Sequence, residues 1–376
     1  MDINQQALDI HKKFRGKITT SLRDTPTADT LKLYYTPGVG GVSKYVAEHP
    51  STLRDYTWTN NLVAVISDGS AVLGLGNIGP EGAMPVMEGK AMLFKHFANI
   101  DSVPIVLNAH AADEIVATVK AIAPSFGGIN LEDIAAPICF EVEDRLKAEL
   151  DIPVMHDDQH GTAIVVLAGL INAMKVTGRE LADAKIVVVG AGAAGTAIIK
   201  LLHLYAKPRI FVVDSKGVVS KNRTDLNDEK KELLKYTNFS GVDGSLEDIL
   251  QGADVFIGVS KAGLLTAAMV KTMDKNPIIF ALANPTPEIL PDEALAAGAA
   301  VVATGRSDFP NQINNALAFP GIFRGALDNR VQSITDEHKI AAAEVIASLV
   351  EEPSAINIVP PVFDTRLVPT IAKVIV

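Results

Sequence analysis

The stretch that decides the fold reads Lys185-Ile186-Val187-Val188-Val189-Gly190-Ala191-Gly192-Ala193-Ala194-Gly195. Apolar strand formers lead directly into the spelling G-x-G-x-x-G, and a helical pattern follows to residue 205. In such a unit the glycines permit a tight turn, close approach of a pyrophosphate, and close packing of helix on strand. The phosphates would then face the unpaired N–H groups of the helix N-terminus. The residues expected at a dinucleotide cofactor are therefore Gly190, Gly192, Ala193, Ala194 and Gly195.

A second predicted strand, residues 210–213, ends in Asp214, close to the acidic position that such folds place about 20 residues beyond the glycines. We expect this carboxylate to bind the adenosine ribose hydroxyls. It would repel a 2′-phosphate and so favours NAD over NADP. Lys216, Lys221 and Arg223 follow closely and could partly compensate, which leaves NADP open.

Length and composition indicate a globular protein of two domains. The chain has 376 residues, of which 48% are hydrophobic and 21% charged. A net charge of -10 argues against a general nucleic-acid binder, which usually needs a basic face. The single cysteine, Cys139, excludes an intramolecular disulfide and is expected as a buried small apolar residue. With no secretory signal pattern and apolar runs shorter than the roughly 18 residues of a membrane span, we expect a soluble cytoplasmic protein without membrane partners.

Short apolar runs alternate with helical patterns, which predicts an α/β fold with a doubly wound parallel sheet. Predicted strands cover residues 62–66, 103–107, 255–259 and 278–283, and predicted helices cover 7–14, 42–48, 111–123, 162–174 and 337–350. Two further stretches, 129–134 and 152–161, are strands or loops that carry adjacent acids. Residues 33–41 are expected as a loop, and a helix is expected to start near Pro85 because Pro80 and Gly82 interrupt an earlier one. We place the domain boundary near residue 160, with a first domain of residues 1–160 and a nucleotide-binding domain of residues 161–376.

Adjacent acids follow two of the apolar stretches. They are Glu132 and Asp133 in the first case and Asp157 and Asp158 in the second. Carboxylate oxygens in this number, without a cluster of histidine or cysteine, suit Mg²⁺ or Mn²⁺ better than zinc. The alternative, solvated loop acids and helix caps, stays open from the residues alone.

Four further residues are candidates for chemistry. Lys90 lies in a glycine-flanked segment, and a lysine desolvated in a cleft can act as a base, although most lysines lie on the surface. Tyr35 is a candidate proton donor or a packed aromatic. Asn284 directly follows a predicted strand of the nucleotide domain, where open α/β sheets bind ligands, and Asn315 could hydrogen-bond a small polar substrate. Turn formation is the alternative for both asparagines.

Five motifs, taken in this order, resemble the malic enzymes in their short bacterial form, over essentially the whole chain. They are Tyr35-Thr36-Pro37-Gly38-Val39-Gly40, Leu73-Gly74-Leu75-Gly76-Asn77-Ile78-Gly79 leading to Gly89-Lys90, Leu131-Glu132-Asp133, His156-Asp157-Asp158-Gln159-His160-Gly161-Thr162-Ala163, and Ala283-Asn284-Pro285-Thr286. The resemblance implies an N-terminal malic-type α/β domain followed by a Rossmann-like NAD(P)-binding domain with a C-terminal helical tail. It also implies a homodimer.

The implied activity is divalent-metal-dependent oxidative decarboxylation of L-malate to pyruvate and CO₂, with reduction of NAD(P). By the resemblance, Mg²⁺ or Mn²⁺ is bound by Glu132, Asp133 and Asp158. Lys90 would take the proton of the malate C2 hydroxyl, with Asp157 sharing the role of base, and Tyr35 would protonate C3 of enolpyruvate. The resemblance further implies that Asn284 and Asn315 hold substrate and nicotinamide.

One departure concerns the substrate carboxylate. The long eukaryotic form carries an arginine before the glycine segment, where this chain has Val72. The group that binds the carboxylate is therefore not assigned, and Lys90 is the one candidate. Three other functions stay open: malolactic activity, which converts malate to lactate with NAD retained, a metal-free β-decarboxylating or amino-acid dehydrogenase, and a non-catalytic module that senses NAD.

Overall fold

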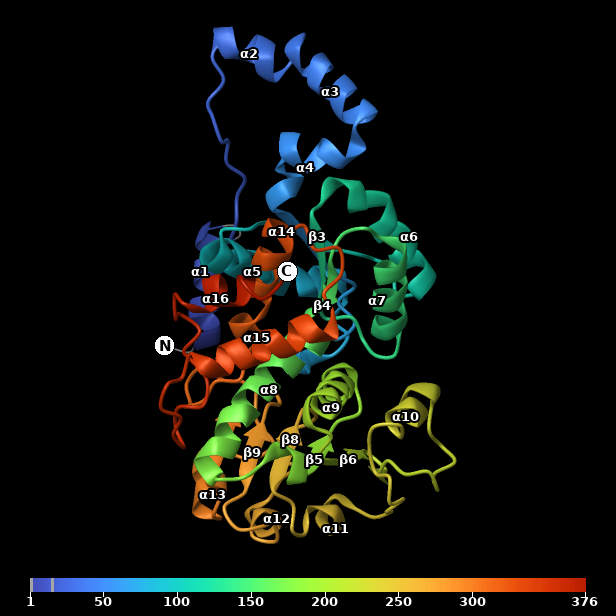
Figure 1. The fold of residues 1–376 in the computed structure, drawn as a ribbon, viewed down its shortest axis with the longest axis vertical. Helices are drawn as coiled ribbons and strands as arrows, with labels where there is room; N and C mark the ends of the chain where they lie inside the picture. Colours follow the sequence, from blue (N-terminus) through green and yellow to red (C-terminus); the bar gives the residue numbers. More distant parts are fainter. Residues whose placement is uncertain (1–2, 15–16) are drawn as a thin grey trace.

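The computed structural model describes residues 3–14 and 17–376, and it contains two sheets of mainly parallel strands (Figure 1). A long helix, α8 (Asp157–Thr177), begins directly after the last strand of the first sheet and leads into the second sheet. The predicted α/β class with a doubly wound parallel sheet is confirmed. The predicted boundary after residue 160 falls in the first turns of α8 and stays a prediction.

The first sheet has the order β2-β1-β3-β4 with all strands parallel. Its strands are β1 (Leu62–Ser67), β2 (Asp101–Val106), β3 (Gly128–Leu131) and β4 (Val154–His156), and its helices are α5 (Gly79–Ala98), α6 (Ala112–Ile122) and α7 (Ile138–Glu149). Side chains of β1 alternate between two cores, since Leu62 and Ile66 belong to one core and Val63 and Val65 to the other. Both faces of β1 are therefore covered, as is usual for parallel sheets.

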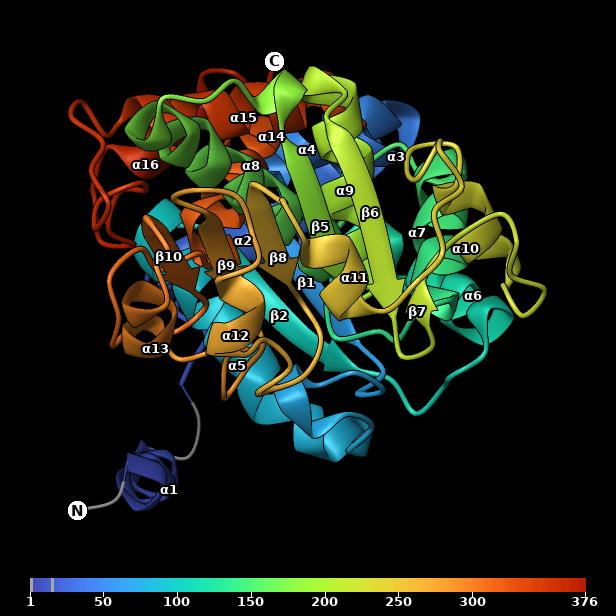
Figure 2. The same cartoon turned by 90° about the horizontal axis from the view of Figure 1, so that it is seen from below.

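The second sheet has the order β10-β9-β8-β5-β6-β7, in which only β7 runs antiparallel to its neighbour. Its strands are β5 (Lys185–Val189), β6 (Arg209–Asp214), β7 (Gly217–Val218), β8 (Val255–Gly258), β9 (Ile278–Ala281) and β10 (Val301–Thr304). Its helices are α9 (Ala193–Ala206), α10 (Asp228–Leu233), α11 (Leu246–Leu250), α12 (Ala267–Val270) and α13 (Pro291–Ala296), of which α11 and α12 lie in front of the sheet in Figure 2. The chain proceeds from β5 to β6 on one side and returns to β8 on the other, so the strand order reverses beside β5. Open α/β sheets bind ligands at such a point, and the glycine-rich turn follows β5 there.

The C-terminal helices pack back onto the first domain. They are α14 (Phe319–Asp328), α15 (Asp336–Ser348) and α16 (Leu367–Ala372). Phe94 of α5 contacts Phe319 and Phe323 of α14 edge to face, with ring centroids 4.7 and 5.3 Å apart. Helix α8 is long and apolar enough to cross a membrane, but 67% of its apolar window is buried, as in a core helix.

A segment near the N-terminus projects away from both sheets, at the top of Figure 1. It comprises α2 (Ala28–Tyr34) and α3 (Gly38–Glu48), which we call the N-terminal arm, and it follows α1 (Ile3–Phe14) and precedes α4 (Leu53–Tyr56). Within the described residues, α2 and α3 bury no side chain. The arm therefore has no core of its own and contributes to none in this chain.

Three predicted boundaries are wrong. Residues 33–41 are not a loop, because α2 runs to Tyr34 and α3 begins at Gly38. Helix α5 begins at Gly79 rather than near Pro85, because Pro80 lies in the first turn, where its missing N–H costs nothing. Helix α8 begins at Asp157 rather than at residue 162, so the second pair of acids lies in a helical turn.

Candidate active site

A cavity of about 820 Å³ opens where the ends of the two sheets meet. It brings together most of the candidate residues, from six separate segments of the sequence. Those that line it are Lys90, Glu132, Asp133, Asp158, Gly192, Ala193, Ala194, Asn284 and Asn315. The acids, the lysine and the glycine-rich turn therefore belong to one site.

Three carboxylates form a compact triad in this cavity. Glu132 and Asp133 follow β3, Asp158 lies in the first turn of α8, and one oxygen of each lies within 4.8 Å of the others. The Asp133 backbone adopts a positive φ of 53°, and its N–H donates to Asp158 Oδ2 at 2.7 Å. This contact holds the two acidic segments in register.

The electrostatics of the triad favour a cation. Burial raises the pKa of Glu132 well above its ordinary value, Lys90 opposes that effect, and the neighbouring aspartates raise the pKa further. Negative charge is therefore crowded here beyond what Lys90 offsets. Hard oxygen donors are the ligands that Mg²⁺ and Mn²⁺ prefer, so Glu132, Asp133 and Asp158 fit a divalent ion.

Lys90 of α5 is buried, as a lysine that serves as a base in a cleft should be. Its Nζ lies 2.6 Å from Asp157 Oδ2 and 2.9 Å from Glu132 Oε1, and 4.3 Å from the ring centroid of Phe319. Burial alone would lower the pKa of Lys90, but the carboxylates of Asp157, Glu132 and Asp158 outweigh it and raise the pKa. The lysine is thus a cation held between the triad and Asp157.

The first turn of α8 leaves no space beside Asp157, whose side chain is fully buried. A Cβ at Gly161, one turn along the helix, would lie 1.9 Å from Asp157 Oδ1. Only glycine fits there, which explains physically why a glycine stands four residues after Asp157.

Glu143 of α7 supports the same turn from behind and was not predicted from the sequence. It is buried, and its carboxylate accepts the His156 backbone N–H at 2.9 Å and the Gln159 side-chain amide at 3.3 Å. His160 Nε2 lies 2.8 Å from Glu143 Oε2, and Lys147 Nζ lies 2.7 Å from Oε1. Burial alone would raise the pKa of Glu143, but His160 and Lys147 hold it well below its ordinary value. In the sequence, Glu143 lies in a segment for which no motif or helix is predicted.

The nucleotide side of the cavity has the predicted construction. Gly192 directly precedes α9, and a Cβ at Gly195 would lie 1.8 Å from the carbonyl oxygen of Gly190, so the third glycine permits the close approach of helix and strand. Asn284 follows β9, and Asn315 begins a short 3₁₀ helix before α14. Both asparagines line the cavity as expected.

Asp214, at the end of β6, lies outside this cavity and is held by two cations. Arg223 donates to both of its oxygens at 2.7 and 3.1 Å, and Lys230 Nζ lies 2.6 Å from Oδ2. Burial would raise the pKa of Asp214, but these hydrogen bonds outweigh it and lower the pKa to about 2. Of the three cations expected nearby, Arg223 pairs with the carboxylate, and Lys216 reaches it only through its backbone N–H. Lys230 was not predicted.

Two residues considered for the substrate end, Tyr35 and Val72, do not line this cavity. Tyr35 does not join the cavity of its own chain, because it lies between the two helices of the arm and is 67% exposed. Val72, at the position of the absent arginine, is fully buried. Among the described residues that line the cavity, the cations are Lys90 and Lys17, and Lys17 Nζ donates to the Pro85 carbonyl at 2.5 Å. Lys17 stands in a polar segment without a motif, so no pattern in the sequence indicates its role.

Comparison with known families and proteins identifies the family of this chain. The family model of the malic enzyme N-terminal domain matches residues 11–112 and 109–147, and that of the malic enzyme NAD-binding domain matches residues 159–375. The chain is 56% identical to the bifunctional malic/malolactic enzyme of Bacillus subtilis, over 100% of this chain and 92% of that protein. It is 53% identical to the NAD-dependent malic enzyme of Geobacillus stearothermophilus, over 96% of this chain and 76% of that protein.

A solved structure extends the match to three dimensions. The crystal structure of an NAD-dependent malic enzyme from Thermotoga maritima superposes with a TM-score of 0.94 at 50% identity and covers 98% of each chain. Sequence and fold therefore agree over nearly the whole chain, and the protein belongs to the malic enzyme family of oxidoreductases.

Proposed function

We propose that the protein catalyses oxidative decarboxylation of L-malate to pyruvate and CO₂, with reduction of NAD(P), in a reaction that depends on Mg²⁺ or Mn²⁺. The observation that carries the proposal is the single cavity that joins the carboxylate triad, the buried Lys90 and the glycine-rich turn. A metal-free dehydrogenase would have no use for three carboxylates beside a buried lysine, and a cofactor sensor would need neither.

The triad and the turn would hold the two groups that the chain itself cannot supply. A divalent ion bound by Glu132, Asp133 and Asp158 would supply Lewis acidity toward the oxygen atoms of malate, and NAD(P) would accept the hydride from C2. Cleavage of the C3–C4 bond, which releases CO₂, would draw on the same Lewis acidity. The remaining steps are proton transfers, which side chains of this chain carry out.

Lys90 and Asp157 form the base. The neutral amine of Lys90 takes the proton of the C2 hydroxyl, and Asp157, 2.6 Å away, stabilises the ammonium that results. Positive charge at the triad favours the neutral amine, because like charges lower the pKa of a lysine. The pair therefore becomes a base when the site is loaded.

Tyr35 is the proton donor to C3, and it reaches the site from a second copy of the chain. The cavity of one chain lacks Tyr35, while the arm that carries it leaves apolar side chains exposed. Those more than a third exposed include Leu31, Leu33, Tyr34, Val42 and Tyr45. A two-fold homodimer would cover this surface and complete both sites, because each arm would serve the other chain.

Lys17 binds a substrate carboxylate. It shares the cavity with Lys90, and its ammonium lies beside Gly89, where a Cβ would lie 3.7 Å from Lys17 Nζ. We expect Lys17→Met to raise the KM for malate about tenfold with little change in kcat, because the lost contact serves ground state and transition state alike. A large fall in kcat with an unchanged KM would contradict this assignment.

NAD is the proposed cofactor, with NADP as a weaker alternative. Asp214 stays ionised and so repels a 2′-phosphate, although Arg223 and Lys230 offset part of its charge. The relatives also differ in cofactor. That of Geobacillus stearothermophilus is named NAD-dependent, and one of Rhizobium meliloti is named NADP-dependent.

The direct test follows absorbance at 340 nm with L-malate and either NAD or NADP, with and without Mn²⁺, while pyruvate and lactate are measured. We expect metal-dependent NADH formation with an equal amount of pyruvate. Equal rates in the presence of a chelator would contradict the role of the triad. Faster reduction of NADP would contradict the role of Asp214.

Malolactic activity is the second candidate, because the Bacillus subtilis relative at 56% identity is named for both activities. It would convert malate to lactate in the same cavity without net NADH. Lactate formed at the rate at which malate disappears, with no change at 340 nm, would replace the first proposal by this one.

A further inference from the structure

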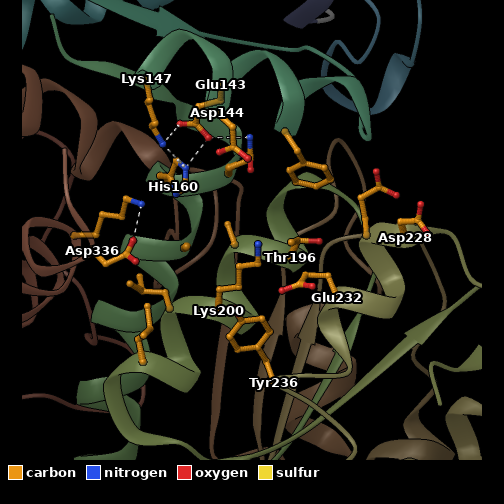
Figure 3. A pocket seen from close by; sticks show the side chains of 18 residues that line it. Glu143, Asp144, Lys147, His160, Thr196, Lys200, Asp228, Glu232, Tyr236 and Asp336 are labelled. Atoms are coloured by element: carbon orange, nitrogen blue, oxygen red, sulfur yellow. Dashed lines mark hydrogen bonds and ion pairs between the residues drawn. The ribbon is translucent and has the colours of Figure 1, made fainter. Parts of the chain in front are cut away.

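A second cavity, of about 640 Å³, lies on another face of α8 and shares no described lining residue with the active-site cavity. Its walls come from α7, α8, α9, α10 and α15 (Figure 3). Gln159 and His160 line it, whereas Asp158 and Thr162 of the same helix line the active site. The proposed reaction makes no use of this space.

Two polar groups of α9 point into this cavity without a protein partner. Thr196 is 5% exposed, and its hydroxyl has no hydrogen-bond partner in the described part of the chain. One turn further on, Lys200 forms no ion pair with any described residue, and Figure 3 shows both side chains directed into the space. Buried polar groups are normally satisfied, so an unpartnered hydroxyl beside a free ammonium indicates a missing ligand.

The charged groups around the cavity fall into paired and unpaired ones. Three lysines and six carboxylates line it, but most of them pair with one another or with neighbours outside. Lys147 pairs with Glu143 and Lys339 with Asp336. Asp228 pairs with Lys231 and Glu232 with Lys235, and neither lysine lines the space.

The groups left unpaired have both signs. They are the ammonium of Lys200 and the carboxylates of Asp144 and Glu229, for which the described residues provide no ion pair. A simple anion would meet an excess of negative charge, and a simple cation would leave Lys200 unmatched. Phe140, Leu201 and Leu204 supply an apolar part of the wall.

We propose that this cavity is a second binding site, for a small zwitterion with the chemistry of an α-amino acid. The ligand carboxylate accepts hydrogen bonds from Lys200 and the Thr196 hydroxyl, and the ligand ammonium faces Asp144 and Glu229. A short apolar side chain packs against Leu201 and Leu204. The inference goes beyond the proposed function and does not rest on it.

The probe is L-norvaline, titrated by calorimetry into the full chain without malate or NAD(P). Removal of its ammonium gives pentanoate, and removal of its carboxylate gives n-butylamine, so the two analogues test the charges one at a time. We expect one norvaline per chain, bound at least about tenfold more tightly than either analogue, because each lost charge removes a charge-assisted hydrogen bond.

Two variants locate the site. Lys200→Gln and Thr196→Val should each weaken norvaline binding about tenfold. The matched control is Lys271→Gln, which removes an exposed lysine outside the cavity and should leave binding unchanged. Thr196→Val keeps the shape of the side chain and removes an unsatisfied hydroxyl, so we expect it to fold at least as stably as the parent.

Four results would each overturn the proposal. They are the absence of norvaline binding up to its solubility, equal binding of pentanoate, equal binding of n-butylamine, and norvaline binding that neither cavity variant weakens. Equal binding of pentanoate would identify an anion site, and equal binding of the amine a cation site. Because no turnover is measured, these results are independent of those that test the proposed reaction.

Discussion

The active-site cavity and the N-terminal arm differ in the side chains that they bury: the cavity buries charged groups, and the arm exposes apolar ones. In the cavity, the charged groups Lys90 and Glu132 are buried and contact each other. In the arm, Leu33 and Tyr35 are more than 60% exposed, and the two helices bury no residue. Buried charge and exposed apolar surface are both costly unless something compensates them.

The difference shows which half of the site one chain can complete. In the cavity the compensation is internal, because carboxylates and a lysine neutralise one another and a divalent ion fits the triad. In the arm nothing within the described chain supplies it. We infer that a single chain holds the metal and the base, and that its proton donor serves a second chain.

The largest effect should come from a substitution in the active-site cavity, the half of the site that one chain completes. We expect Lys90→Met to lower kcat with L-malate about 10³-fold, because the base is lost while the length of the side chain is kept. Mn²⁺ binding should persist, since the triad is untouched. Lys95→Met, on the exposed side of the same helix, should keep near-normal activity. A Lys90→Met enzyme as active as the control would contradict the assignment.

Removal of the hydroxyl from the arm should have the next largest effect. We expect Tyr35→Phe to lower pyruvate formation about 10²-fold, because protonation of C3 loses its acid. Tyr34→Phe, which removes the neighbouring phenol that donates to Asp24, is the matched control and should stay near normal. Equal activities of the two variants would show that Tyr35 has no chemical role.

A smaller effect should follow from weakening the contacts that Glu143 makes behind the first turn of α8. Glu143→Gln keeps the shape of the side chain but weakens its contacts with His160 and Lys147. We expect the Mn²⁺ concentration for half-maximal activity to rise about tenfold with kcat nearly unchanged at saturating metal, as for residues that orient metal ligands. Glu141→Gln, exposed on the same helix, should change neither value. A fall in kcat without any change in metal dependence would contradict the positioning role.

The smallest effect concerns the thiol on that helix. Burial raises the pKa of Cys139 to about 12, so at pH 8 the reactive thiolate is about 10⁻⁴ of the total. We expect slow reaction with a chromogenic disulfide reagent, and the thiolate fraction should keep rising from pH 8 to pH 10. In a Ser333→Cys variant, the added thiol in an exposed loop should react rapidly at pH 8. Equally fast reaction of Cys139 in the parent would show that α7 opens.

Sequence reasoning predicted what depends on local pattern. The strand, the three glycines and Asp214 specify β5, α9 and the end of β6 through neighbouring residues, and the structure confirms all three. Helix starts were less accurate. Pro80 looks like a breaker but is harmless in a first turn, and Asp157 looks like the end of a loop but begins α8.

Long-range contacts account for the rest. Glu143 and Lys230 act on residues more than a dozen positions away, and no spacing in the sequence indicates those pairings. The motif around Tyr35 predicted a residue type and a role, but the motif does not show on which chain the tyrosine acts. The exposure of the arm points to a second copy, in line with the homodimer that the resemblance implies.

The central claim is that each site is shared between two chains, and subunit mixing tests it most directly. The Lys90→Met and Tyr35→Phe variants, each nearly inactive alone, are unfolded together, refolded in equal amounts and assayed for Mn²⁺-dependent NADH and pyruvate formation. Half of the dimers should be mixed, with one of two sites intact, so we predict recovery of about one quarter of the parent activity. Activity no greater than the average of the two variants, with mixed dimers shown to be present, would place both residues in the same chain and contradict the account.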